Sequence, residues 1–244
     1  MQQALEHSHT RQAIKERLAR GPHSNYLRDW IYGGIDGAVT TFAIVAGVAG
    51  AELSATVVLV LGFANLFADG LAMAASNYSG TKAERDDYLR VLDIERKHIT
   101  MVPDGEREEI RQIFAAKGFS GNDLERIVTV ISSDPRLWTE TMAVEEYGLS
   151  PTPRSAMLAG LSTFAAFIIC GLVPLVTYLS AGGLSASAFA AGVTFFGVGA
   201  IKSRWSTAPA WRSGLETFLI GMSAAAVAFA VSFGLKALFR LSVA

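Results

Sequence analysis

Apolar residues gather in five long runs, and polar residues fill the segments between them. A helix that crosses a bilayer needs about 20 mostly apolar residues, and each run meets or nearly meets that length. The runs cover residues 31–51, 56–78, 156–179, 184–201 and 214–239. The pattern therefore predicts an all-α membrane protein with five transmembrane helices.

A segment of a different kind separates the second and third runs. Residues 79–153 are rich in Glu, Asp, Arg and Lys. Helix-breaking residues at Pro103, Gly105 and Gly118, and a helix start at Asp134-Pro135, indicate three or four helices. We expect the first to continue out of the second span. The predicted organisation is an N-terminal cytoplasmic segment (1–28), spans one and two (29–78), a helical metal-binding insert (79–153) and spans three to five (154–244).

Basic residues near the span ends predict the orientation, because cytoplasmic loops carry an excess of Lys and Arg. The N-terminal flank and the link between spans four and five are basic, with Lys15, Arg17, Arg20, Arg28, Lys202, Arg204 and Arg212. The links at 52–55 and 180–187 have no basic residue. The N-terminus and the insert should face the cytoplasm. The C-terminus should then lie outside, where Lys236 and Arg240 fit the rule less well.

Composition excludes several classes of protein. The 244 residues are 51% hydrophobic and 18% charged, with a mean hydropathy of +0.34, which is too apolar for an ordinary soluble domain. The net charge of -1 gives no basic field for nucleic acid. A single cysteine, Cys170, rules out an intramolecular disulfide and a multi-cysteine metal site. The charged N-terminus lacks the apolar core of a secretory signal peptide.

Polar side chains interrupt the first two spans. A carboxylate at the centre of a span costs roughly 2.5 to 3.5 kcal/mol on insertion scales, so such residues usually face a bundle interior or a hydrated path. Asp36 in the first span is either a structural hydrogen-bond anchor or an ion or proton site. The second span carries a stripe of polar residues and one methionine at i+4 spacing, which lines one helix face: Asn65, Asp69, Met73 and Asn77. Hard and soft donors on one path suit a borderline ion such as Fe(II).

The insert holds three groups of metal-ligating side chains. Residues three or four apart lie side by side on a helix, and the groups are Glu95 with His98, Glu106 with Glu109, and Met142 with Glu145 and Glu146. Their convergence would create a metal site. The alternative is a set of solvated, charged helix faces.

One motif raises an enzymatic alternative. Glu95 and His98 match the Glu-x-x-His pattern of di-iron carboxylate bundles, which would suggest an oxidase or a storage protein. Such sites use two of these motifs, and the other three histidines, His7, His9 and His23, lie in the N-terminal tail. No histidine follows His98, so a Ser/His/Asp hydrolase has no base in the spans.

Two sequence stretches resemble the vacuolar iron transporter family. They are RDWIYGGIDGAVTTFAIVAGVAGA in the first span and GFANLFADGLAMAASNY in the second, followed directly by the acidic insert. The resemblance extends from Arg28 to the C-terminus and is to bacterial-type members. It implies a five-span homodimer that exchanges cytosolic Fe(II), and sometimes Mn(II), for protons.

The resemblance also implies roles for individual residues. It places Asp36 and Met73 on a path between two subunits, and it assigns metal capture to Glu95, Glu106, Glu109, Met142 and Glu146. Three positions depart from the family pattern. His98 and Asn77 stand where a glutamate is common, and Ala143 stands where a second methionine is common. A neutral histidine still binds Fe(II) or Zn(II). Alanine at position 143 removes a soft sulfur ligand, which keeps Mn(II) as a candidate ion.

We therefore expect a transporter, not an enzyme, in a bacterial inner membrane. Its cargo should be Fe(II), with Mn(II), Zn(II) and Co(II) as further divalent candidates, and it should need no prosthetic group. Two alternatives stay open at this point. One is a membrane-anchored ferroxidase or iron-storage protein, and the other is a structural membrane protein whose acidic insert binds a partner.

Overall fold

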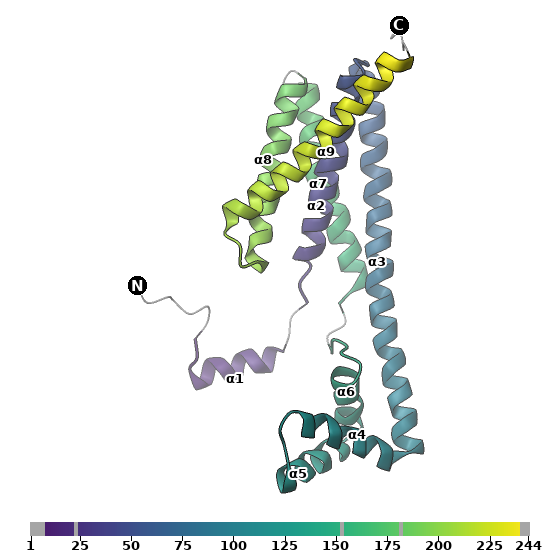
Figure 1. The fold of residues 1–244 in the computed structure, drawn as a ribbon, viewed down its shortest axis with the longest axis vertical. Coiled ribbons are helices and arrows are strands. Elements are labelled where there is room, and N and C mark those ends of the chain that lie inside the picture. The colour runs from purple at the N-terminus through teal and green to yellow at the C-terminus, as the bar shows by residue number, and fades with distance from the viewer. Residues whose placement is uncertain (1–7, 22–23, 152–153, 181–182, 240–244) are drawn as a thin grey trace. The chain divides into compact units, whose positions relative to one another are not determined.

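A computed structural model describes residues 8–21, 24–151, 154–180 and 183–239. His7, His23, Pro153 and Arg240 lie outside the described residues. The helices are α1 (Arg11–Arg20), α2 (Leu27–Gly50), α3 (Ala55–Met101), α4 (Pro103–Ala116), α5 (Gly121–Ser132), α6 (Pro135–Glu145), α7 (Ala156–Ser180), α8 (Leu184–Lys202), the 3-10 helix η1 (Ser203–Trp205) and α9 (Ala210–Phe239). Figure 1 labels the main helices.

The chain divides into two compact units. The insert unit comprises residues 81–155 together with the segment up to residue 24, and the membrane unit comprises residues 25–80 and 156 onward. Helix α3 contributes to both, because it runs without a break from the second span into the insert.

The prediction of five spanning helices is confirmed. Helices α2, α3, α7 and α9, and α8 together with η1, are long and apolar enough to cross a membrane. Two helix starts differ from the apolar runs in the sequence. Helix α2 begins at Leu27, and α9 begins at Ala210, because polar residues at a membrane boundary still continue a helix. As a result, Asp29 lies inside the first turn of α2.

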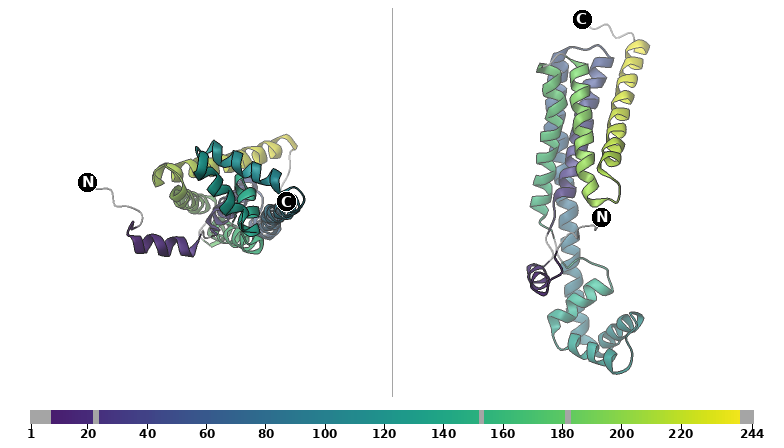
Figure 2. Two further views of the ribbon diagram at one scale, coloured as in Figure 1. Left: turned by 90° about the horizontal axis from the view of Figure 1, so that it is seen from below. Right: turned by 90° about the vertical axis from the view of Figure 1, so that its left-hand side faces the viewer.

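Helix α2 lies at the centre of the membrane unit. It contacts α7, α8 and α9, and the right-hand view of Figure 2 shows the long helices side by side. Glycines allow the closest approach: a Cβ atom at Gly33 or Gly37 would overlap the backbone of Thr163 or Phe167 on α7. Small residues at this spacing let helix backbones pack closely in a membrane, where lipid weakens the hydrophobic drive for association.

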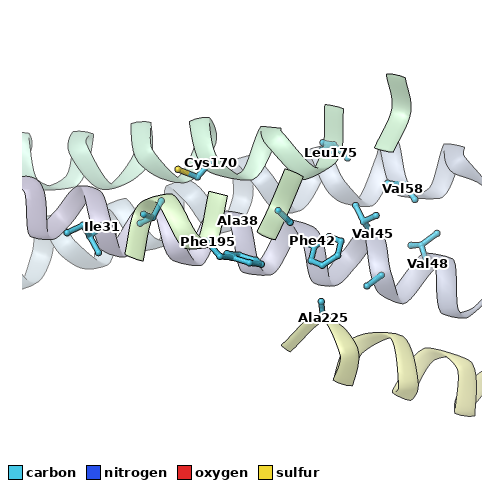
Figure 3. Close-up of a cluster of buried hydrophobic side chains, with 13 residues drawn as sticks. Ile31, Ala38, Phe42, Val45, Val48, Val58, Cys170, Leu175, Phe195 and Ala225 are labelled. Atoms are coloured by element: carbon cyan, nitrogen blue, oxygen red, sulfur yellow. The ribbon is translucent and has the colours of Figure 1, made fainter. Parts of the chain in front are cut away.

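Apolar side chains from four helices fill the space around α2. Figure 3 shows Ala38, Phe42 and Val45 of α2 facing Phe195 of α8 and Leu175 of α7, with Ala225 of α9 nearby. Each of these residues is at most 3% exposed. The Phe42 and Phe195 rings are tilted with centroids 6.5 Å apart, a favourable aromatic arrangement.

Two apolar clusters hold the insert unit together. The first joins Ile110 of α4, Val128 and Ile131 of α5, and Trp138 and Met142 of α6. The second joins α3 to α6 through Tyr88, Val91, Leu92 and Ala143. Helix α6 takes part in both clusters, so it fixes the positions of α3, α4 and α5 within the unit.

Candidate functional site

Three metal-ligating side chains meet where α3 ends and α4 begins. The Nδ1 atom of His98 lies 3.3 Å from Oε1 of Glu106 and 3.8 Å from Oε1 of Glu95. One donor atom from each residue falls within 4.8 Å of the others. We refer to Glu95, His98 and Glu106 as the carboxylate-histidine cluster.

A sharp corner in the chain brings these residues together. Only Val102 separates α3 from α4, and Pro103 opens α4, where its missing N–H is no loss. Glu106 therefore lies in the first turn of α4, with its backbone N–H donating to the carbonyl of Val102 at 3.2 Å. Glu95 and His98 lie one turn apart on the last part of α3.

The two carboxylates are deeply buried. Glu95 is 0% exposed and Glu106 is 3% exposed, whereas the His98 side chain is 45% exposed. The Oε2 atoms of both glutamates have no hydrogen-bond partner among the described residues. A buried carboxylate oxygen without a partner is unfavourable, so the cluster favours either a bound cation or a proton shared between the Glu95 and Glu106 carboxyl groups.

Burial and neighbouring charge both act on Glu106. Burial, followed by the charges of Glu95 and Glu109, raises the pKa of Glu106 to about 7. Burial and then Glu95 and Glu109 also raise the pKa of Glu146. A proton would therefore compete near neutral pH with any cation that binds this cluster.

The donor set suits a borderline divalent ion. Two ligands opposite one another on an ion with bonds of about 2.1 Å lie roughly 4.2 Å apart, so side-chain shifts of less than about 1 Å would close the cluster around one ion. Carboxylate oxygen and imidazole nitrogen are ligands for Fe(II), Mn(II) and Zn(II).

The other four predicted ligands of the insert occupy different environments. Glu109 and Glu146 are exposed but near enough to act electrostatically on Glu106. Met142 is fully buried in the first apolar cluster, where packing alone accounts for it. Glu145 forms an ion pair with Lys117. The structure thus brings three of the seven residues together, places two nearby and gives two of them other contacts.

Sequence reasoning missed one residue at the cluster. The Tyr147 hydroxyl donates a hydrogen bond to Oε1 of Glu95 at 3.2 Å. Burial and then Glu95 raise the pKa of Tyr147 to about 12. The contact spans 52 positions in the chain, and no local spacing in the sequence indicates it.

In the membrane unit, polar residues of α2 and α3 come together. The Asp36 and Asp69 carboxylates lie near enough for their like charges to interact. Asp36, Asn65 and Met73 are partly buried and Asp69 is exposed. The amide nitrogen of Asn65 is buried without a hydrogen-bond partner among the described residues.

A second polar layer ties three helices together. The Asn77 amide of α3 donates to Oδ1 of Asp29 at 2.9 Å and to Oγ1 of Thr163 at 2.7 Å. Asp29 and Thr163 are 2% and 1% exposed. Neither was predicted from the sequence, although Asp29 precedes Asp36 by seven positions and therefore lies on the same face of α2.

The two layers follow from an antiparallel register. Helices α2 and α3 are joined by a short turn at 51–54, so residue numbers increase in opposite directions along the two helices. Asp29 lies at the level of Asn77, and Asp36 lies at the level of Asp69. Met73 stands between the two levels on α3, and Asn65 stands one turn beyond Asp69. On α3, polar or thioether side chains thus recur at each turn from Asn65 to Asn77.

A family model and several known proteins match this sequence. A family model described as the VIT family matches residues 27–232. The vacuolar iron transporter 1 of Eucalyptus grandis is 32% identical over 211 residues, which cover 84% of this chain and 85% of the relative. The vacuolar iron transporter 1 of Arabidopsis thaliana is 31% identical over 211 residues and covers 84% of both chains. The vacuolar iron transporter of Toxoplasma gondii is 37% identical over 174 residues, 68% of this chain and 57% of the relative.

Proposed function

The chain belongs to the VIT family, and from that premise we propose that it carries Fe(II) out of the cytosol across the membrane in exchange for protons. The family relatives are transporters, so the chain is an integral membrane transporter and not an enzyme. The ferroxidase alternative therefore loses its support. The observation that carries the proposal is the pair of unpartnered, buried carboxylate oxygens of Glu95 and Glu106 beside His98.

Capture takes place at the carboxylate-histidine cluster in the insert, on the cytoplasmic side. Glu95, His98 and Glu106 bind the ion directly. Glu109 and Glu146 raise the local negative potential and attract cations to the cluster. Met142 packs in the first apolar cluster and Glu145 pairs with Lys117, so both have at most an auxiliary part in capture.

Transfer then follows the polar layers of α2 and α3. The ion passes to Met73 and Asp36, and Asn65, Asp69 and Asn77 line the same stripe of α3. Asp36 cannot hold a metal ion and a proton together. Competition for its carboxylate therefore couples inward movement of protons to outward movement of metal.

A second copy of the chain completes the path. Small residues at i+4 spacing lie directly beside the polar stripe of α3, and all of them are exposed: Ala64, Ala68, Ala72 and Ser76. Such a row permits close helix packing in a membrane. The proposed homodimer would cover this face and enclose Asp69, which one chain leaves exposed.

The donor atoms of the cluster determine which ions it can bind. His98 and the carboxylates also accept Mn(II), Zn(II) and Co(II). Without a thioether at Ala143, the cluster should discriminate weakly against Mn(II). The proposed location is a bacterial inner membrane with the N-terminus and insert in the cytoplasm.

Transport by the purified chain is the direct test. Proteoliposomes are loaded with an Fe(II)-sensitive dye, and Fe(II) is supplied anaerobically on the side of the insert. The lumen is either more acidic than that side or at the same pH. The proposal expects flux that rises with the gradient. The absence of flux above protein-free vesicles would overturn it. Stoichiometric oxygen consumption in air would instead point to Fe(II) oxidation.

A further inference from the structure

Backbone hydrogen bonds and a packed leucine define the turn that ends α6. Gly148 adopts a φ of 67°, which favours glycine over other residues. The backbone N–H of Leu149 donates to the carbonyl of Ala143 at 3.0 Å, and the Leu149 side chain packs on the second apolar cluster. Tyr147 lies within this turn, so its backbone position is set by the contacts on either side of it.

The Tyr147 side chain reaches from this turn to α3. Its hydroxyl donates to Oε1 of Glu95 at 3.2 Å. Glu95 is 0% exposed, and its second oxygen has no hydrogen-bond partner among the described residues. The phenol therefore holds Oε1, the oxygen that lies 3.8 Å from Nδ1 of His98, and thereby fixes the orientation of the whole carboxylate.

A neutral donor has a particular advantage at this place. Glu106, Glu109 and Glu146 already surround Glu95 with negative charge. A lysine or arginine at position 147 would pair with Glu95 and compete with an incoming cation. A phenol fixes the carboxylate without adding charge, as partners of metal-ligating side chains commonly do.

We propose that Tyr147 is a positioning residue of the metal cluster, which holds the Glu95 carboxylate in the orientation that presents it to the ion together with Glu106 and His98. The inference rests on the proposed function, because it assumes that the cluster captures metal. It assigns Tyr147 no bond to the ion. The phenol remains protonated and acts only through Glu95.

Tyr147→Phe in the full chain tests the inference. Tyr147 is 40% exposed, so removal of one hydroxyl should leave the fold intact. Tyr88→Phe is the matched control, because Tyr88 belongs to the same unit and lies two turns away from Glu95 on α3. The purified protein in detergent is titrated with Co(II), and affinity is read by competition with a chromogenic chelator. Tyr147→Phe should weaken Co(II) binding about tenfold or more, and Tyr88→Phe should leave it unchanged.

A spectroscopic signature separates positioning from general stabilisation. Co(II) binding to Glu95 changes the hydrogen bond that the phenol donates, so it should shift a tyrosine absorption band in the ultraviolet. The shift should occur in wild type and in Tyr88→Phe and disappear in Tyr147→Phe. A wild-type protein that binds Co(II) without any tyrosine shift would overturn the inference, whatever the stability of the variants.

The remaining outcomes distinguish failure of the positioning role from failure of metal capture. If the wild type binds Co(II) and Tyr147→Phe binds equally well, the positioning role is wrong and the capture site stands. If the wild type does not bind Co(II), metal capture fails and the inference falls with it. A phenolate-to-metal charge-transfer band would make Tyr147 a ligand, which also contradicts the inference.

Discussion

The two polar sites of this chain differ in how completely one copy encloses them. In the insert unit, Glu95 and Glu106 are buried within a single chain, and α6 fixes the helices around them. In the membrane unit, Asp36 is half-buried and Asp69 is exposed on a face of small residues. A capture site can be completed by local helix packing, whereas a transfer path in a membrane needs a second surface to exclude lipid.

Because one chain encloses the insert site but not the membrane site, we expect the two units to have separate functions. Binding should depend on the insert cluster, and movement across the membrane should depend on the α2–α3 layers. The largest expected effect is that of Asp36→Asn, which removes the carboxylate for which we propose that a metal ion and a proton compete. Fe(II) flux in proteoliposomes should fall to the protein-free level, while Co(II) affinity of the detergent-solubilised protein stays as in wild type. Normal flux with intact proton coupling in this variant would remove Asp36 from the path.

The next effect concerns the insert. Glu106→Gln keeps the shape of the side chain and removes a ligand charge beside Glu95 and His98. Because loss of a partner that supports a ligand already weakens sites 10- to 100-fold, loss of a ligand should weaken Co(II) binding by about 100-fold. Chelator competition measures this. Unchanged affinity would mean that the ion binds elsewhere.

Metal affinity of the insert should also depend on pH. The pKa of Glu106 is raised to about 7, so the carboxyl is largely protonated at pH 6 and largely ionised at pH 8. Bound metal must displace that proton, so affinity should increase by about tenfold between these pH values. The same titration of Glu106→Gln should be markedly flatter. An affinity that falls as pH rises would contradict the assignment of Glu106 as the competing group.

The open face of α3 gives a smaller but discriminating effect. Ala72→Cys places a thiol on the row of small residues, and Phe67→Cys places one at an exposed position about 140° around the helix. The native Cys170 is buried. Mild oxidation in native membranes should crosslink Ala72→Cys into dimers several times more efficiently than Phe67→Cys. Equal crosslinking of both would argue against a second copy on this face.

The smallest effect is expected at Glu145. Its ion pair with Lys117 is partly exposed, and such pairs contribute little to stability. Glu145→Gln should change Co(II) affinity by less than about twofold, and it serves as a charge-matched control for Glu106→Gln. A loss as large as that of Glu106→Gln would show that Glu145 leaves Lys117 to become a main ligand.

Much of the architecture could be predicted because it depends on local pattern. Run length and composition identify five spans, and the confirmed continuity of α3 follows from the lack of proline between Ala55 and Met101. The side-by-side placement of Glu95 and His98 is likewise a property of one helix. Glu106 joins these two residues because the chain turns sharply at Pro103, and a proline in the sequence is a signal for the start of a helix.

Other parts of the sites depend on contacts that no local period encodes. Thr163 meets Asn77 because Gly33 and Gly37 let α7 approach α2 closely. The Tyr147 contact depends on the packing of α6 on α3 through Ala143. The pairing of Glu145 with Lys117 depends on where α4 ends. Each is fixed by the packing of helices distant in sequence, which i+3 and i+4 spacing does not determine.

Fe(II) flux as a function of Fe(II) concentration tests the separation of capture and transfer most directly. Wild type, Asp36→Asn and Glu106→Gln are compared in identical proteoliposomes under the same imposed pH gradient. We expect Glu106→Gln to reach the wild-type maximal rate at higher Fe(II) and Asp36→Asn to show no flux at any concentration. Loss of the maximal rate in both variants, or recovery of Asp36→Asn at high Fe(II), would contradict this separation.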